Sequence, residues 1–227
     1  MAQGNLKTHS GTKIKTHNLG FPRIGASREL KFALEAYWQG EITLDKLQAV
    51  GRELRARHWQ LQANAGIDLV PVGDFSFYDQ ILDCSAMLGV VPPRFEWQGG
   101  DVDLDTYFRM ARGRAPTGKD VDACEMTKWF DTNYHYLVPE LHQQQKFKLS
   151  SEKLFEEIAE AQELGYKVKP VITGPITYLW LAKCKQGDFD KLTLLDDLLV
   201  TYKQIFLRLQ QLDVEWVQLD EPALVLD

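Results

Sequence analysis

The chain has 227 residues, of which 44% are hydrophobic and 26% are charged, and its formal net charge is −6. This composition is typical of a globular protein with a substantial core, and it lacks the broad basic field of a general nucleic-acid or membrane surface. The three cysteines, Cys84, Cys124 and Cys184, lie far apart without CxxC spacing, which indicates a reducing compartment rather than disulfides or structural zinc.

Residues 1–15 are polar, basic and aperiodic, and they are predicted to form a disordered leader, with a functional tail as the alternative. No apolar run approaches the 18 residues of a membrane span, and the N-terminus has no signal-type apolar core. The protein is therefore predicted to be cytoplasmic, with neither a membrane nor a nucleic acid as its partner.

From Thr16 onward, short apolar runs alternate with segments of helical period. The apolar runs predict strands near residues 18–21, 68–72, 135–138, 168–173 and 215–219. Buried strands that alternate with helices are typical of a parallel sheet, so we expect these five strands side by side in chain order, with helices outside. Residues 92–125 form the longest irregular region, which we interpret as a functional insertion.

Four of the expected strands end in polar, Gly or Pro residues: "GFPRIG", "VGDFSFYD", "ITGPITY" and "LDEPAL". Such residues at the carboxyl ends of parallel strands are typical of the active face of a (β/α) barrel. A doubly wound sheet would give a similar pattern, but the sequence has no GxGxxG fingerprint for a dinucleotide. The predicted fold is α/β, a partial (β/α)8 barrel over residues 16–227.

Three cations, Arg23, Arg28 and Lys31, lie where the first expected strand passes into a helix. Ser27 is expected to cap that helix, and a helix N-terminus favours a carboxylate or a phosphate. The residues therefore predict an anion site at this junction. Solvated surface charge is the alternative.

Other polar residues follow the later strands. Asp220 and Glu221 are interpreted either as a general base or as structural carboxylates, and the structural interpretation is favoured. Asp74 either holds a cation or polar ring or forms a turn. Residues 125–136, "EMTKWFDTNYHY", include Lys128 and either line a pocket for a flat ligand or pack beneath a loop. No nucleophile elbow or metal-ligand spacing is present, so no catalytic and no metal-binding residue is predicted.

Several motifs together resemble the N-terminal part of cobalamin-independent methionine synthase, from about residue 17 to residue 227. They are "HNLGFPRIGASRELK", "RELRARHW", "GIDLVPVGDFSFYD", "FRMARGRAPTG", "EMTKWFDTNYHYLVPE", "KVKPVITGPITYLWL" and "EWVQLDEPALVLD". The resemblance implies one of two face-to-face (β/α)8 barrels in an enzyme that transfers the methyl group of 5-methyltetrahydropteroyltriglutamate to homocysteine. It also implies that Arg28, Glu29, Leu30, Lys31 and Lys128 bind the folate, the cations meeting its glutamate tail.

In that family a zinc ion in the C-terminal barrel binds homocysteine as a thiolate, and no cobalamin is used. The resemblance places the zinc ligands outside this chain. We therefore expect the chain alone to be inactive and to self-associate, because strand edges at Leu19 and Val217 would lack partners. The helix face of Leu194, Leu195, Leu198 and Leu199 would also lose apolar cover. The alternatives are a non-catalytic small-molecule binding or interaction module and another barrel enzyme acting on anionic tetrapyrroles or keto acids.

Overall fold

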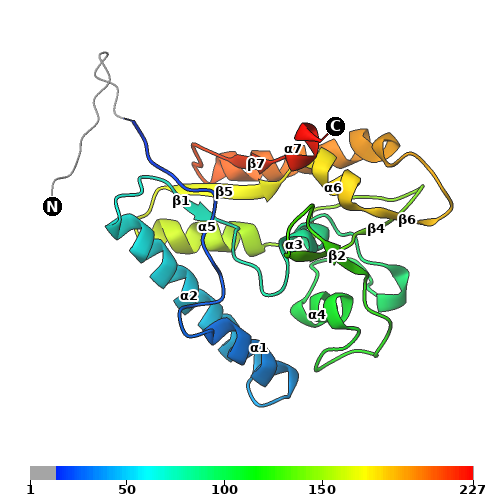
Figure 1. The fold of residues 1–227 in the computed structure, drawn as a ribbon, viewed down its shortest axis with the longest axis horizontal. Helices are drawn as coiled ribbons and strands as arrows, with labels where there is room; N and C mark the ends of the chain where they lie inside the picture. The colour runs from blue at the N-terminus through cyan, green and yellow to red at the C-terminus, as the bar shows by residue number, and fades with distance from the viewer. Residues whose placement is uncertain (1–13, 227) are drawn as a thin grey trace.

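The computed structural model describes residues 14–226 (Figure 1), so most of the expected leader lies outside the described residues. The α-helices are α1 Glu29–Trp38, α2 Leu44–Asn64, α3 Gln80–Met87, α4 Leu104–Arg112, α5 Lys153–Glu163, α6 Pro175–Leu181 and α7 Leu195–Gln211. The strands are β1 Val70–Val72, β2 Met126–Lys128, β3 His135–Leu137, β4 Glu140–His142, β5 Val168–Thr173, β6 Lys183–Gln186 and β7 Gln218–Asp220. Short 3-10 helices are η1 Pro93–Phe95, η2 Lys191–Leu194 and η3 Pro222–Val225.

The main sheet has three parallel strands in the order β1-β5-β7. Val70 pairs with Val168 on one side of β5, and Val171 pairs with Gln218 on the other. The fold is therefore α/β with parallel strands, as predicted. The strands form no closed barrel within the part of the chain that the structure describes.

The prediction of five neighbouring strands is wrong for two of them. Residues 18–21 form no strand, and the only β-bridge of this first segment within the described chain joins His17 to Leu69. Side chains of the sheet also hold this segment, since Lys169 donates to the carbonyl oxygen of Asn18 and Gln218 to that of Leu19. The strand predicted at residues 135–138 is present as β3, His135–Leu137, but β3 pairs antiparallel with β2 instead of lying between β1 and β5. The nearby β2 segment reaches β3 through a short hairpin, and a local pairing of this kind needs no long loop closure.

The expected irregular region at residues 92–125 contains the helix α4. Asp103 caps it by accepting a hydrogen bond from the backbone N–H of Thr106 at 2.8 Å, and Gly113 ends it with a φ of 77°. Both signals are present in the sequence, since Asp is a favoured N-cap and Gly a favoured residue after a helix. The description of this region as irregular is therefore corrected.

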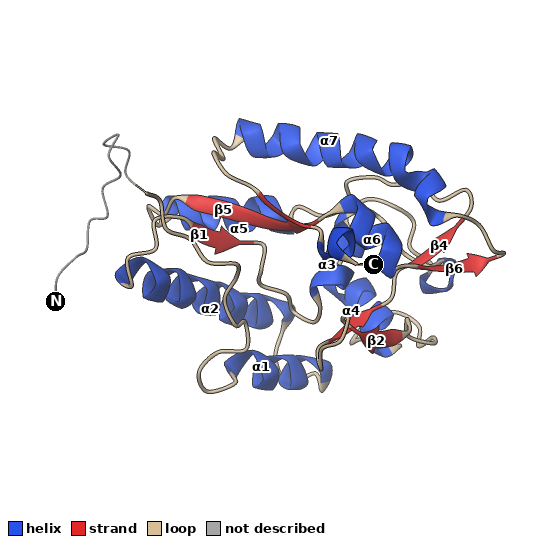
Figure 2. Cartoon of the chain, turned by 45° about the horizontal axis from the view of Figure 1, so that its top comes forward, coloured by secondary structure: helices blue, strands red, loops and turns tan. Residues whose placement is uncertain are grey.

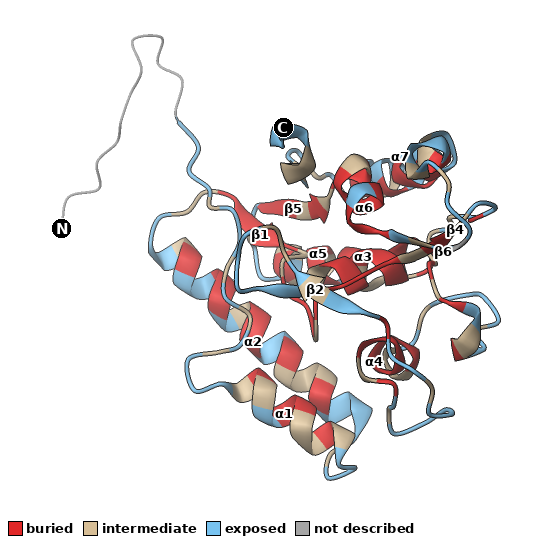
Figure 3. Cartoon of the chain, turned by 45° about the vertical axis from the view of Figure 1, so that its right-hand side comes forward, coloured by how far each residue is buried: buried red, intermediate tan, exposed pale blue. Residues whose placement is uncertain are grey.

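Helices cover the main sheet on more than one side. α5 packs on β1 and β5, α2 packs on β1, and Figure 2 shows α7 and α2 on opposite sides of these strands. The buried residues concentrate on β1, β5 and α3 (Figure 3). A second hydrophobic cluster joins α1, α2 and α4. Among residues 14–226 no helix is long and apolar enough to cross a membrane.

Some apolar side chains remain exposed near the C-terminal edge of the sheet. Trp216 is 54% exposed and Leu219, in the edge strand β7, is 42% exposed. The expected loss of apolar cover is wrong for Leu194, at the end of η2, and for Leu198 in α7, because this chain itself buries both side chains, whereas Leu199 in α7 is exposed. Self-association through these surfaces stays a prediction.

Two glycines with positive φ allow a matched test of packing at the end of β1. A Cβ on Gly73 would lie 2.6 Å from Leu154 Cδ1, whereas a Cβ on Gly66 would meet nothing within 4 Å. Both variants place an alanine in the left-handed backbone region, which costs each variant about 1 kcal/mol of stability. Only Gly73→Ala also overpacks the core. We expect chemical denaturation to show Gly73→Ala less stable than Gly66→Ala by about 1–3 kcal/mol. Equal stabilities would contradict the packing described here.

Candidate functional site

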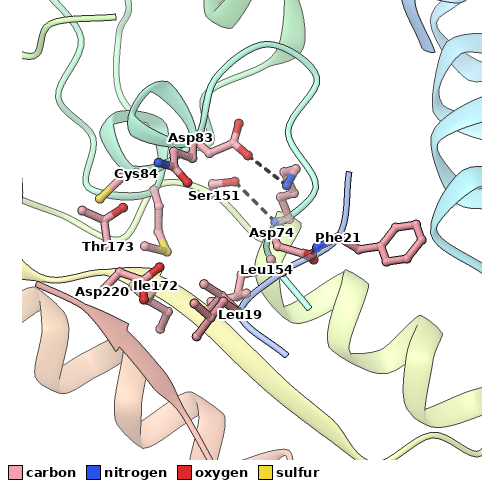
Figure 4. Close-up of a pocket in the computed structure, with 16 residues that line it drawn as sticks. Leu19, Phe21, Asp74, Asp83, Cys84, Ser151, Leu154, Ile172, Thr173 and Asp220 are labelled. Atoms are coloured by element: carbon pink, nitrogen blue, oxygen red, sulfur yellow. Dashed lines mark hydrogen bonds and ion pairs between the residues drawn. The ribbon is translucent and has the colours of Figure 1, made fainter. Parts of the chain in front are cut away.

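A cavity of about 210 Å³ lies at the carboxyl ends of the main strands (Figure 4). Asp74 follows β1, Thr173 ends β5 and Asp220 ends β7, and all three line the cavity. This is the position that the polar strand ends predicted. Its remaining polar lining includes Asp83 and Lys153.

Asp74 ties the N-terminal segment to the end of β1. Its Oδ2 accepts a hydrogen bond from the backbone N–H of Phe21 at 2.7 Å. Burial raises the pKa of Asp74 above its ordinary value, while the hydrogen bond from Phe21 opposes that rise. The carboxyl group of Asp74 therefore joins two segments that are 53 residues apart in the sequence. This is a tertiary contact, not a local turn.

A buried ion cluster lies beside the cavity. Lys153 Nζ lies 3.1 Å from Asp83 Oδ2 and 3.0 Å from Glu157 Oε1, and Arg55 lies 3.4 Å from Glu157. Burial alone would lower the pKa of Lys153, but Asp83 and Glu157 outweigh that effect and raise it. Lys153 therefore stays charged and balances the acidic side of the cavity.

Glu221, directly after β7, has a structural role. Its carboxylate accepts hydrogen bonds from the backbone N–H groups of Ile176 at 3.0 Å and Thr177 at 2.7 Å, in the first turn of α6. A Cβ at Gly174 would overlap this carboxyl group. The contact agrees with the structural interpretation of Glu221. Asp220 accepts from the side chain of Gln218 and also lines the cavity.

The three cations at the start of α1 have different uses. Arg23 donates to the backbone carbonyl oxygens of Ser76, at 3.0 Å, and Tyr78, so its guanidinium holds a loop and is not free for a ligand. The expected cap at Ser27 is wrong, because Arg28 occupies the N-cap position with a φ of 61°. The guanidinium of Arg28 makes no hydrogen bond or ion pair among residues 14–226 and lies 6.0 Å from the ring of Phe32.

Among the predicted folate-binding residues that follow Arg28, two have structural contacts and one is accessible to a ligand. Glu29 accepts from Arg57 at 2.6 Å, and hydrogen bonds, first of all from its own backbone N–H, lower its pKa. Leu30 is fully buried in the cluster of α1, α2 and α4. Lys31 is exposed enough to meet a ligand, and its Nζ lies 3.0 Å from Glu35. Only Arg28 and Lys31 therefore present charge to the outside.

Lys128, the remaining predicted residue, ends β2 opposite His135 in β3. Its side chain is exposed and makes no hydrogen bond or ion pair within the described chain. No hydrogen bond or ion pair joins the side chain of Lys128 to the start of α1 among the described residues. The structure instead connects the two parts through residues 75–79, here called the bridging loop.

Asp79, at the end of the bridging loop, binds the hairpin of β2 and β3. Its carboxylate accepts from the backbone N–H groups of Leu82 and Leu137 and from the hydroxyl of Tyr134, each at 3.0 Å. Arg23 binds the same loop from the side of α1. The sequence analysis missed Asp79, although an Asp directly before a helical segment is a recognisable N-cap signal.

These features define an α/β domain with a cavity at the ends of parallel strands and a separate group of exposed cations. Residues 15–227 match the family described as "Cobalamin-independent synthase, N-terminal domain". The chain belongs to the cobalamin-independent methionine synthase family, which confirms the resemblance seen in the sequence.

Relatives from three bacteria support this assignment. The chain is 61% identical over 214 residues to the 5-methyltetrahydropteroyltriglutamate–homocysteine methyltransferase of Proteus mirabilis. It is 59% identical over 214 residues to the enzyme of that name from Serratia proteamaculans, and 60% identical over 211 residues to that from Photorhabdus laumondii. The matches cover 93–94% of this chain but 28% of each relative's length.

The buried carboxyl of Asp79 predicts a specific pH dependence of stability. Burial raises its pKa from 3.8 to about 6, so the folded chain binds a proton more tightly than the unfolded chain. This contribution to stability is fully present below pH 3.8 and is lost as the pH rises through about 6. Relative to Asp79→Asn, the wild type should lose about 2 kcal/mol of unfolding free energy between pH 4.5 and 7.

Urea denaturation of both proteins at the two pH values measures this difference, and groups that titrate in both proteins cancel. Asp120→Asn, at an exposed position, is the control and should follow the wild type. A constant difference between wild type and Asp79→Asn would contradict the raised pKa.

Proposed function

We propose that this chain forms the folate-binding, N-terminal part of a cobalamin-independent methionine synthase. The complete enzyme would transfer the methyl group of 5-methyltetrahydropteroyltriglutamate to homocysteine and produce methionine. The proposal is supported by the names of the relatives and by one observation above all: Arg28 presents a guanidinium without an acceptor. A guanidinium is suited to paired hydrogen bonds with a carboxylate, the group that a glutamate tail repeats.

In this proposal Arg28, Lys31 and Lys128 receive the carboxylates of the tail. Glu29 and Leu30 act without touching the ligand, because Arg57 holds Glu29 and the core holds Leu30. The aligned peptide dipoles at the start of α1 also favour a negative group there. No residue of this chain is assigned a catalytic role.

Zinc does not fit the residues described here. Among residues 14–226 no group of three or more His, Cys, Asp or Glu side chains is placed to hold a metal ion. Cys84 and Cys124 are buried, and burial, the largest influence on each, raises the pKa of both thiols to about 12. Both thiols therefore stay protonated, whereas zinc binds the thiolate. We propose that zinc and homocysteine bind to residues outside this chain, in the cytoplasm.

The strand-end cavity favours an alternative in which the chain is a non-catalytic small-molecule binding module. Its ligand would then meet Asp74, Thr173 and Asp220 instead of the exposed cations. Variants at the cations separate these two proposals, because the cavity lining includes neither Lys31 nor Lys128.

Lys31→Ala and Lys128→Ala should each weaken binding of the triglutamate folate roughly tenfold, and binding of the monoglutamate folate less. Each change removes a charge-assisted hydrogen bond from the tail, and partial solvation reduces its effect. Calorimetric titration of the chain with both folates measures the difference. Lys46→Ala, which removes an exposed charge from α2, is the matched control and should bind as the wild type. Equal losses for both tail lengths would show that the lysines do not bind the tail.

The 227-residue chain supplied with Zn²⁺, homocysteine and the triglutamate folate should produce no methionine. The physical reason is that the described residues offer no zinc site on which a thiolate would form. Mass spectrometry of the reaction mixture measures the product. Turnover by the purified chain would contradict the assignment of the chemistry to residues outside it.

A further inference from the structure

Arg112 and Arg114 are two neighbouring cations without acceptors at the end of α4. Neither guanidinium makes a hydrogen bond or an ion pair within residues 14–226. By contrast, Arg55 pairs with Glu160 and Arg94 pairs with Glu140. The "RGR" segment belongs to a motif that the sequence analysis quoted, and the proposed function gives it no role.

The two arginines lie beside the outer face of α1. The guanidinium carbon of Arg112 lies 3.7 Å from the centre of the ring of Trp38, the last residue of α1. A groove of about 450 Å³ is lined by Glu35, Trp38, Gln39, Arg112, Arg114 and Ala115. Glu35 is also the ion-pair partner of Lys31, at 3.0 Å. The groove therefore begins next to Lys31 and continues along the helix to the two arginines.

The charged side chains that line this groove are two cations, Arg112 and Arg114, and one anion, Glu35. The carboxylate of Glu35 is paired with Lys31, so the lining favours an anion at the end with the arginines. Burial lowers the pKa of Arg112, and the like charge of Arg114 lowers it further, so a bound anion would relieve repulsion between them. The indole N–H of Trp38 is buried and also lacks an acceptor. Buried donors of this kind are normally satisfied in proteins, so Trp38 carries an unpaired donor beside the two solvent-accessible arginines.

We propose that Arg112 and Arg114 form a carboxylate subsite that continues the folate-tail site of Arg28 and Lys31 along α1. This inference rests on the proposed function, which supplies the tail. Guanidinium groups also bind phosphate, but the continuity of the groove with Lys31 favours a chain of carboxylates. Lys31 and Trp38 are seven positions apart, about 10 Å along a helix, so a single glutamate at Lys31 does not reach the subsite. The subsite therefore distinguishes long tails from short ones.

Binding of mono- and triglutamate folates to the 227-residue chain tests the subsite, with calorimetry for affinity and tryptophan emission as a local signal. Arg114→Gln should weaken triglutamate binding roughly tenfold and leave monoglutamate binding unchanged. Arg114 is exposed and contacts no partner, so this variant should fold normally. Arg112→Lys, which keeps the charge but loses the planar fork, should give a smaller loss of the same pattern. The emission change on triglutamate binding should become smaller in Trp38→Phe, which keeps the other five tryptophans of the chain.

Lys119→Gln is the matched control, because it removes one exposed charge from the same loop and Lys119 does not line the groove. Equal losses in Arg114→Gln and Lys119→Gln, equal losses for both tail lengths, or no loss in Arg114→Gln would overturn the subsite. Displacement of the triglutamate folate by an equal concentration of inorganic phosphate would also overturn it, since it would indicate a general anion site.

A free γ-linked triglutamate peptide separates failure of the subsite from failure of the proposed function. If the wild type binds the peptide with dependence on Arg114 but binds no folate, the subsite is supported and the proposed function falls. If folate binding depends on Lys31 and not on Arg114, the proposed function is supported and the subsite falls. Absence of binding to every one of these ligands overturns both.

Discussion

The arrangement of the candidate site depends on the buried carboxylate of Asp79. It accepts hydrogen bonds from the start of α3, from Leu137 in β3 and from the hydroxyl of Tyr134. Burial disfavours its charged form, and the three donors oppose that effect, which leaves its pKa at about 6. Arg23 donates to carbonyl oxygens of the same bridging loop, so this loop connects the segment before α1 with the hairpin that carries Lys128.

The cations near the start of α1 show what a sequence pattern can and cannot distinguish. Arg23, Arg28 and Lys31 have similar charge and similar local settings, and the sequence predicts one anion site from all three. The structure uses Arg23 for a carbonyl 53 residues away, an acceptor that only the tertiary fold places there. Arg28 keeps its charge free, whereas Lys31 has a half-exposed partner in Glu35. An exposed pair of that kind contributes little and is readily exchanged for a ligand.

The strands also show that a sequence pattern predicts burial better than it predicts tertiary partners. The segment 168–173 was predicted with its observed bounds, because a continuous buried Val/Ile run followed by Gly-Pro indicates both burial and an end. The run at 135–138 was recognised as buried, and Tyr136 and Val138 are buried, but burial does not say which strand is the partner. Leu19 belongs to an apolar run and is nevertheless 75% exposed, since residues 18–21 have no strand partner in the described chain. The cap expected at Ser27 is wrong because the chain enters α1 through the left-handed backbone of Arg28. The helix α4 escapes prediction because its signals lie among Gly, Pro and Asp residues.

At the start of α1, two of the four residues predicted there to bind the folate, Arg28 and Lys31, present their charge outward. Leu30 and Leu34 are buried and fix the rotation of the helix, which places Lys31 and Glu35 about 100° further around its axis, where both are half-exposed. The left-handed backbone of Arg28 is a conformation that costs a residue with a side chain roughly 1–2 kcal/mol, so the surrounding hydrogen bonds have to hold it. One such bond joins the N–H of Arg28 to the carbonyl oxygen of Gly25 at 3.1 Å. Packing at Leu30 and strain at Arg28 therefore determine where the charges point, and a change at Leu30 would act on a ligand through the orientation of the helix, without any direct contact.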